Sequence, residues 1–271
     1  MAGPFPPFEP HGGAGPRIRE IPLRVIVPNL ITVLAICAGL SGIRLAFEHR
    51  MEMAVAMVLI AAFLDGVDGR LARMLKASSK FGEQMDSLAD IVNFGVAPAL
   101  VLYAYLLDGA GAIGWIAALL FAIACALRLA RFNVMLDDPD RPAWQADYFV
   151  GVPAPAGAVL VMLPVYLGFL GLEPTRAVAF AACAYTLAIA FLMVSRLPVY
   201  SGKASGSRVR RELAIPLILA VVLCALLLAS YPWLTLAVSA ILYLVSLAWS
   251  VRAYSQRAAR EEGGLEESAA E

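Results

Sequence analysis

The chain is poor in charged residues. Only 15% of its 271 residues are charged, whereas 61% are hydrophobic. A soluble domain has about 25% charged and about 45–50% apolar residues. The formal net charge is zero, which gives no electrostatic support for nucleic-acid binding. This composition excludes an ordinary soluble fold and predicts a polytopic membrane protein.

Histidine and cysteine are also scarce, with 2 and 4 residues. Each cysteine stands alone in an apolar run, without a CxxC pairing. We therefore expect small buried apolar side chains, not disulfides or zinc ligands, at Cys37, Cys125, Cys183 and Cys224. This scarcity leaves oxygen atoms as the ligands for any metal.

The apolar residues form long continuous runs without alternation, which favours helices over strands. A membrane-spanning helix needs roughly 20 apolar residues, and a helical bundle satisfies its own backbone in lipid. We predict an all-α, polytopic transmembrane helical bundle of about eight spans: 28–47, 53–73, 87–107, 112–132, 150–170, 176–195, 213–230 and 233–250.

Polar ends flank a single expected membrane domain, residues 17–255. Residues 1–16 are rich in Pro and Gly, lack the pattern of a signal peptide and are expected to be disordered, while residues 256–271 form an acidic tail. If both termini lie on one side of the membrane, that side holds 18 of the 21 Lys and Arg residues. This asymmetry predicts that both termini and the loop after the second span are cytoplasmic.

Four aspartates lie at the facing ends of the second and third spans, on either side of the segment that joins them. Asp65 and Asp68 share a helix face at i, i+3, and Asp86 and Asp90 share one at i, i+4. Acids at membrane depth cost about 2.5–3.5 kcal/mol each, and four together also repel one another. Two helix ends joined by a short hinge can direct all four carboxylates towards one point. Such oxygen ligands favour Mg²⁺ or Mn²⁺, and a pair of ions can assist displacement at a phosphate.

Two other interpretations compete with this one. The acids could form ion pairs at a solvated helix end with Arg70, Arg73, Lys76 and Lys80. They could also belong to a cation-coupled transporter, because acids within membranes line ion pathways. Transport acids tend to lie at mid-membrane on broken helices, whereas these lie near the cytoplasmic ends of their spans.

The segment resembles a known family signature. The pattern Asp65-x2-Asp68-Gly69-x2-Ala72-Arg73-x8-Gly82-x3-Asp86-x3-Asp90 is similar to that of the CDP-alcohol phosphatidyltransferases, with every fixed position present. The resemblance implies that CDP-diacylglycerol donates its phosphatidyl group to an alcohol and that CMP leaves. By the same resemblance, all four aspartates hold metal ions, two in number, and Asp90 also accepts the proton of the alcohol.

The resemblance also implies which residues bind the CDP-lipid. The stretch Asn29-Leu30-Ile31-Thr32 is similar to an element of the family's first helix. Arginine suits bidentate contact with phosphate, which agrees with the role that the signature gives to Arg73. The complete expected set is Asn29, Thr32, Gly69, Arg73, Ser79 and Gly82.

Three segments after the signature resemble the serine-using branch of this family, namely 86–99, 126–133 and 151–158. They imply L-serine as the acceptor and phosphatidylserine as the product. Inositol phosphate, glycerol phosphate and choline stay open as alternatives. Asn93 stands where the branch is expected to have Ser, and Gly151-Val152-Pro153 stands where Gly-Leu-Pro is commoner.

We expect acceptor-binding residues at Asn93, Arg128, Arg131 and Asn133. The two arginines, at i, i+3, can provide a cation for the serine carboxylate. Alternatively, they extend to the lipid headgroups and anchor the helix. The resemblance further implies an enzyme of the bacterial inner membrane that contacts lipids and forms a homodimer.

Overall fold

The computed structural model describes residues 23–75, 79–136, 148–195, 198–200, 211–247 and 249. The predicted all-α membrane bundle is confirmed. Its α-helices are α1 Leu23–Phe47, α2 Met51–Met74, α3 Lys80–Asp90, α4 Ala97–Tyr105, α5 Ala112–Leu136, α6 Ala154–Val161, α7 Leu163–Phe169, α8 Arg176–Val194 and α9 Arg211–Ser230, followed by a helix at Pro232–Leu247. The predicted disordered start, 1–16, and acidic tail, 256–271, lie outside the described residues.

Each of the eight predicted spans overlaps a helical segment of the described residues. Among the described residues, four segments are long and apolar enough to cross a membrane: Ile26–Phe47, Lys80–Tyr105, Ala112–Val134 and Arg176–Val194. The segment Lys80–Tyr105, which corresponds to the third predicted span, begins earlier than predicted, because the helix already starts at the polar hinge. The fifth predicted span is divided at Met162 into α6 and α7, and Pro164 lies in the first turn of α7, a position where its missing N–H breaks no helical hydrogen bond.

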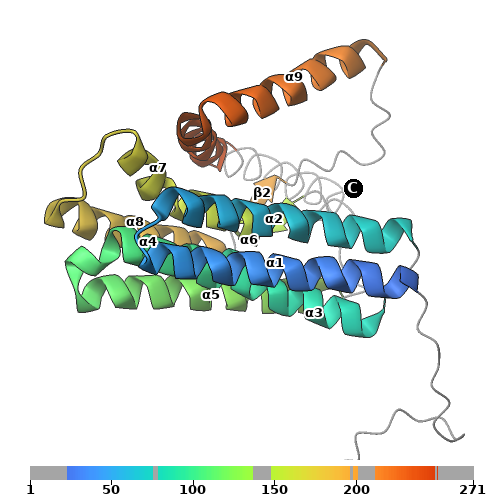
Figure 1. Ribbon diagram of the computed structural model, residues 1–271, viewed down its shortest axis with the longest axis horizontal. Coiled ribbons are helices and arrows are strands. Elements are labelled where there is room, and N and C mark those ends of the chain that lie inside the picture. Colours follow the sequence, from blue (N-terminus) through green and yellow to red (C-terminus); the bar gives the residue numbers. More distant parts are fainter. Residues whose placement is uncertain are drawn as a thin grey trace, which may run out of the picture.

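Helices α1 and α2 form an antiparallel hairpin along one side of the bundle (Figure 1). A Cβ atom on Gly42 would lie 3.0 Å from the Ala54 carbonyl oxygen, so glycine is needed for this close approach. Small buried residues such as Ala46 and Ala54 continue the contact. Small side chains let helix backbones approach closely where lipid provides no hydrophobic driving force. The hairpin thereby holds the polar end of α2 beside the start of α1.

The third span is a helix of mixed geometry. A π-helix, η1 Ile91–Val96, joins α3 to α4, and the Ala97 N–H bonds to the Val92 carbonyl oxygen. Pro98 follows in the first turn of α4 and cannot donate a backbone hydrogen bond. Asn93 and Gly95 are buried in this π-helix. Such turns are rare and frequently lie at functional sites.

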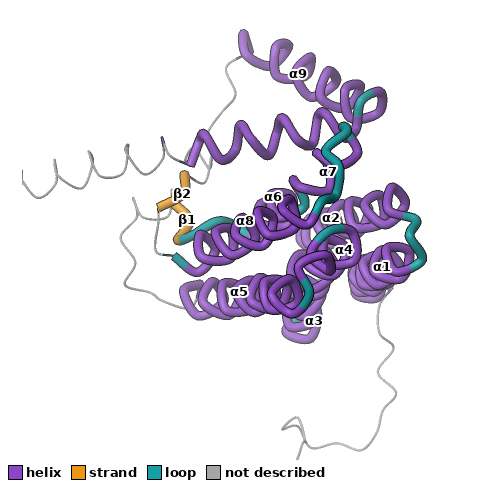
Figure 2. The backbone as a smooth tube through the Cα atoms, turned by 90° about the vertical axis from the view of Figure 1, so that its left-hand side faces the viewer, coloured by secondary structure: helices purple, strands orange, loops and turns teal. Residues whose placement is uncertain are grey.

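A short antiparallel ladder, absent from the predicted architecture, joins β1 Tyr148–Val150 to β2 Pro198–Tyr200. It lies at the end of α6 and α8 (Figure 2). Three residues are too few to show the alternation that reveals a strand in a sequence. Gly151 follows β1 with φ +76°, and a Cβ atom there would lie 2.5 Å from the Met193 carbonyl oxygen. This glycine therefore fixes how the ladder leads into α6.

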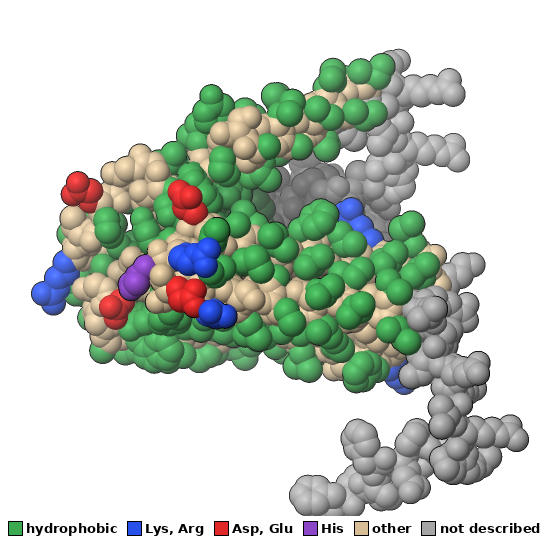
Figure 3. Space-filling view, in the orientation of Figure 1, with side chains coloured by type: hydrophobic (Ala, Val, Ile, Leu, Met, Phe, Trp, Pro, Cys, Tyr) green, Lys and Arg blue, Asp and Glu red, His purple; other side chains and the backbone are tan. Residues whose placement is uncertain are grey.

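The face of the molecule shown in Figure 3 is largely apolar, as expected for helices surrounded by lipid. Helix α9 lies apart from the bundle in both ribbon views, and its apolar side chains are exposed (Figures 1 and 2). All four cysteines are free, and Cys125 and Cys183 are buried as predicted. The prediction was wrong for Cys37 and Cys224, which are exposed. The sequence of a continuous apolar run does not show which of its residues face the interior of the bundle and which face lipid.

Candidate active site

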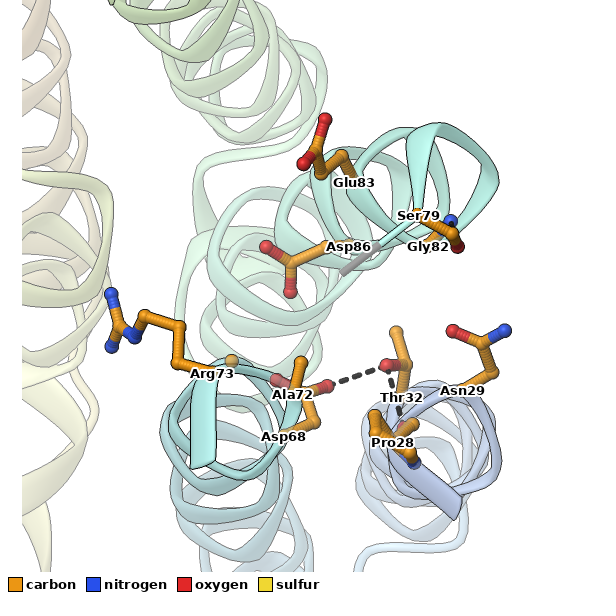
Figure 4. Close-up of a pocket in the computed structure, with 11 residues that line it drawn as sticks. Pro28, Asn29, Thr32, Asp68, Ala72, Arg73, Ser79, Gly82, Glu83 and Asp86 are labelled. Atoms are coloured by element: carbon orange, nitrogen blue, oxygen red, sulfur yellow. Dashed lines mark hydrogen bonds between the residues drawn. The ribbon is translucent and has the colours of Figure 1, made fainter. Parts of the chain in front are cut away.

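The ends of α1, α2 and α3 meet around a pocket of about 280 Å³ (Figure 4). All six residues expected to bind the CDP-lipid line it, together with two of the four aspartates. The complete lining is Pro28, Asn29, Thr32, Asp68, Gly69, Ala72, Arg73, Ser79, Gly82, Glu83 and Asp86. Residues separated by more than 50 positions in the sequence thus form one site. Glu83 lines the pocket without having been expected there, although it lies one helical turn before the signature's Asp86.

The carboxylate of Asp68 is buried, with only 2% of the residue exposed. The hydroxyl of Thr32 donates to its Oδ2 atom over 2.6 Å and also lies 3.2 Å from the Pro28 carbonyl oxygen. The other oxygen, Oδ1, is buried and has no hydrogen-bond partner among the described residues. A buried charged oxygen without a partner is costly, so this atom is suited to meet a cation or a donor from a ligand.

Asp65 and Asp90 lie one helical turn further from the α2–α3 hinge than Asp68 and Asp86. Their carboxyl groups are within hydrogen-bond reach of each other. The Nδ2 group of Asn93 donates to Asp65 Oδ1 over 3.3 Å. Two carboxyl groups in contact need a proton or a cation between them. Asp86 interacts electrostatically with Asp68 and with the deeper pair, so the four acids form one cluster.

No basic side chain in the described part of the chain forms an ion pair with this cluster. Within the described ranges, the aspartates form no ion pair with Arg70, Arg73 or Lys80, and Lys76 lies outside those ranges. Arg73 acts on Asp86 electrostatically, but its side chain is exposed and points away from the pocket centre in Figure 4. The alternative of a solvated, ion-paired helix end therefore finds no support in these contacts.

The chemistry of the cluster fits a hard divalent cation. Its donors are carboxylate oxygens, which Mg²⁺ and Mn²⁺ prefer. In the part of the chain that the structure describes, no three acidic, His or Cys side chains are arranged as a ready metal cage. The partnerless Asp68 Oδ1 atom and the close approach of Asp65 to Asp90 are nevertheless features that a bound cation would stabilise.

The pocket is also suited to phosphate. Ser79 caps α3, and its Oγ atom accepts the Gly82 N–H over 3.0 Å. The start of a helix presents free N–H groups and a partial positive charge that favour anions. A Cβ atom on Gly82 would lie 3.0 Å from Asn29 Oδ1, whereas one on Gly69 would meet no atom of the described neighbouring residues within 4 Å. Gly82 therefore permits contact between two helices, and Gly69 leaves open space for a ligand.

The four expected acceptor residues separate into two groups. Asn93 and Arg128 lie near Asp65 and Asp90, and Arg128 interacts electrostatically with Asp90. Only 7% of Arg128 is exposed, and its guanidinium lies 5.3 Å from the centre of the Phe132 ring. Among the described residues it forms no ion pair. A buried cation of this kind is suited to bind an anionic group of a substrate.

The other two expected acceptor residues contact protein groups. Arg131 donates from Nη1 to the Val194 carbonyl oxygen over 2.7 Å and thus caps the end of α8. Asn133 donates from Nδ2 to Ser87 Oγ over 3.1 Å. Ser87 lies on α3, so this bond connects α5 to the helix that carries Asp86.

Comparisons with known proteins agree with the geometry. A family model described as CDP-alcohol phosphatidyltransferase matches residues 25–194, which include the whole pocket and end with α8. A second, described as CDP-alcohol phosphatidyltransferase 2, matches residues 212–247. The chain is 40% identical over 252 residues to a CDP-diacylglycerol–serine O-phosphatidyltransferase of Mycobacterium leprae (strain TN), which covers 91% of this chain and 81% of that protein. A protein of the same name from Helicobacter pylori (strain J99) is 44% identical over 142 residues, which cover 52% of this chain and 58% of that protein. Another from Bacillus subtilis (strain 168) is 38% identical over 138 residues, which cover 51% of this chain and 74% of that protein.

Proposed function

The chain belongs to the CDP-alcohol phosphatidyltransferase family, and from this membership we propose that it transfers the phosphatidyl group of CDP-diacylglycerol to L-serine. The products are phosphatidylserine and CMP. The observation that carries the proposal is the convergence of α1, α2 and α3 on one pocket lined by all six expected CDP-lipid residues. Relatives named as serine-using enzymes, similar to most of the chain, support L-serine as the acceptor.

The pocket binds the cytidine diphosphate part of the donor. Thr32 orients Asp68, Gly69 leaves room beside the α2 backbone, and the start of α3 faces the phosphates. Asp65, Asp68, Asp86 and Asp90 would hold two Mg²⁺ or Mn²⁺ ions, which supply positive charge for the pyrophosphate when bound. Arg73 adds a mobile cation at the mouth of the pocket, suited to bidentate contact with phosphate.

The acceptor approaches from the deeper pair of aspartates. Arg128 binds the serine carboxylate, which places the hydroxyl of the serine near Asp90. Asp90 takes the hydroxyl proton while the serine oxygen bonds to the phosphorus that carries diacylglycerol, and the bond from that phosphorus to the CMP oxygen breaks. Arg131 and Asn133 complete the proposed acceptor set after exchanging their contacts with Val194 and Ser87. Asn93, which was expected in this set from the sequence, donates instead to Asp65.

The proposed setting is the bacterial inner membrane, with the pocket and both termini cytoplasmic and with two copies of the chain per assembly. The distribution of Lys and Arg supports this orientation. The polar ends of α1, α2 and α3 at one end of the bundle agree with it.

The test is an assay of the purified protein in detergent micelles with CDP-diacylglycerol and a panel of alcohols. CMP release with L-serine alone, in the presence of Mg²⁺ or Mn²⁺, supports the proposal. Release with inositol phosphate, glycerol phosphate or choline instead would assign another acceptor. Absence of release with every alcohol would refute phosphatidyl transfer, and uptake assays in proteoliposomes would then test a cation-coupled transporter.

A further inference from the structure

Asn93 is a fully buried polar residue in the π-helix η1, with none of its surface exposed. Its Nδ2 group donates to Asp65 Oδ1, which joins the third span to α2. Its Oδ1 atom has no hydrogen-bond partner among the described residues. A buried amide whose oxygen has no hydrogen-bond partner costs folding free energy, so a functional role for this residue is expected.

Gly39 of α1 faces the unpaired side of this amide. A Cβ atom on Gly39 would lie 2.7 Å from Asn93 Oδ1 and 3.7 Å from the Ala97 Cβ atom. Real Cβ atoms do not approach an oxygen so closely, and alanine at position 39 would therefore displace the Asn93 amide. The α1 backbone thus confines the amide on one side, while Asp65 holds it on the other.

The two aspartates of α2 are held in parallel ways. Asp68 accepts a hydrogen bond from Thr32 of α1, and Asp65 accepts one from Asn93 of the third span. Both donors are neutral. A neutral donor fixes the orientation of a carboxylate without cancelling its charge, whereas a Lys or Arg partner would compete with a bound cation.

We propose that Asn93 is a positioning residue that orients Asp65 for cation binding. The α1 backbone at Gly39 packs against the Asn93 amide and thereby fixes its position. This inference rests on the proposed function, in which Asp65 is a metal ligand. It differs from the role expected from the sequence, where Asn93 contacts the acceptor. The two roles predict different defects, because one concerns the cation and the other concerns L-serine.

The first test is Asn93→Ala, measured by Mn²⁺ titration of the purified protein, with calorimetric or spin-resonance detection and no turnover. Loss of a residue that orients a metal ligand typically costs about 10–100-fold in affinity. We therefore expect the Mn²⁺ dissociation constant to rise within that range, while KM for L-serine at saturating Mn²⁺ stays near that of the wild type. Unchanged Mn²⁺ affinity with a raised KM for L-serine would overturn the proposal in favour of acceptor binding.

The second test is a double-mutant cycle with Gly39→Ala. We expect this substitution to weaken Mn²⁺ binding when Asn93 is present and to have no further effect in the Asn93→Ala protein, since the group that it displaces is then missing. Additive losses would overturn the role of Gly39. Thr186→Val is the matched control: this buried threonine of α8 bonds within its own helix to the Ala182 carbonyl oxygen, and its loss should leave Mn²⁺ affinity unchanged.

Measurements on the wild-type protein distinguish failure of the proposed function from failure of the positioning role of Asn93. If it neither binds Mn²⁺ nor releases CMP, the proposed function fails before any variant is compared. If it does both and the Asn93→Ala protein matches it, only the positioning role fails. Thermal unfolding without metal checks that each variant is folded, and Asn93→Ala remains decisive if Gly39→Ala does not fold.

Discussion

Replacing Thr32 by valine would remove the hydroxyl that orients Asp68 while keeping the shape of the side chain. The lost hydrogen bond is short, 2.6 Å, and its acceptor is a carboxylate that is only 2% exposed. Hydrogen bonds to charged groups contribute about 1.5–3 kcal/mol, because a buried charge without its donor is poorly compensated. In the Thr32→Val protein, Asp68 would have no side-chain donor within the described ranges.

That range of free energy corresponds to about 10–150-fold in an equilibrium constant at 25 °C, since about 1.4 kcal/mol is tenfold. We expect the loss to appear in the binding of Mn²⁺ and of CDP-diacylglycerol, because Asp68 lines the pocket. KM for L-serine should change little. Mn²⁺ titration and initial rates of CMP release at varied donor concentration measure both effects.

Thr32→Ser is the decisive control, because serine keeps the hydroxyl and loses only a methyl group. Its Mn²⁺ affinity and KM for CDP-diacylglycerol should lie close to those of the wild type. If the valine and serine variants behave alike, the hydroxyl does not orient Asp68 and the reasoning fails. Equal losses for the donor and for L-serine would instead indicate a general disturbance of the bundle.

Three further predictions concern other parts of the site. Gly69→Ala should raise KM for CDP-diacylglycerol at least about tenfold, because the added Cβ atom would enter open pocket space. The thermal midpoint should not fall, because alanine favours the helix by about 1 kcal/mol. A normal KM would show that the donor does not pass beside Gly69. Arg128→Ala should raise KM for L-serine by about 10–100-fold, the expected loss of a charge-assisted hydrogen bond, and an equal rise for the donor would point to misfolding. Asp86→Asn, and separately EDTA on the wild type, should reduce CMP release to background; activity that survives both, measured with labelled donor, would refute cation dependence.

The spacing of acids along a helix predicts which carboxylates share a face, and the structure brings both pairs to the same end of the bundle. The sequence could not show that Asp68 and Asp86 line the pocket while Asp65 and Asp90 lie deeper, because that division depends on how α2 and α3 pack. The short signature was informative because six of its eight fixed residues line the pocket.

The neighbours of the site were less predictable. Arg128 and Arg131 have the same residue type and lie one turn apart, yet one is buried beside Asp90 and the other caps α8 through Val194. The distinction comes from where the end of α8 meets α5, which no pattern within α5 records. The same applies to Asn93, whose partner Asp65 lies 28 positions earlier in the chain.

The π-helix of the third span has a mechanical consequence. A π turn holds one residue more than an α turn, and each residue of an α-helix rotates the chain by about 100°. If Ile91–Val96 kept all its residues but adopted regular α-helical bonding, Asp86 and Asp90 would turn by about that angle relative to α4. The wider π turn thus sets the angular phase between the half of the span that is anchored in the bundle and the half that carries the carboxylates.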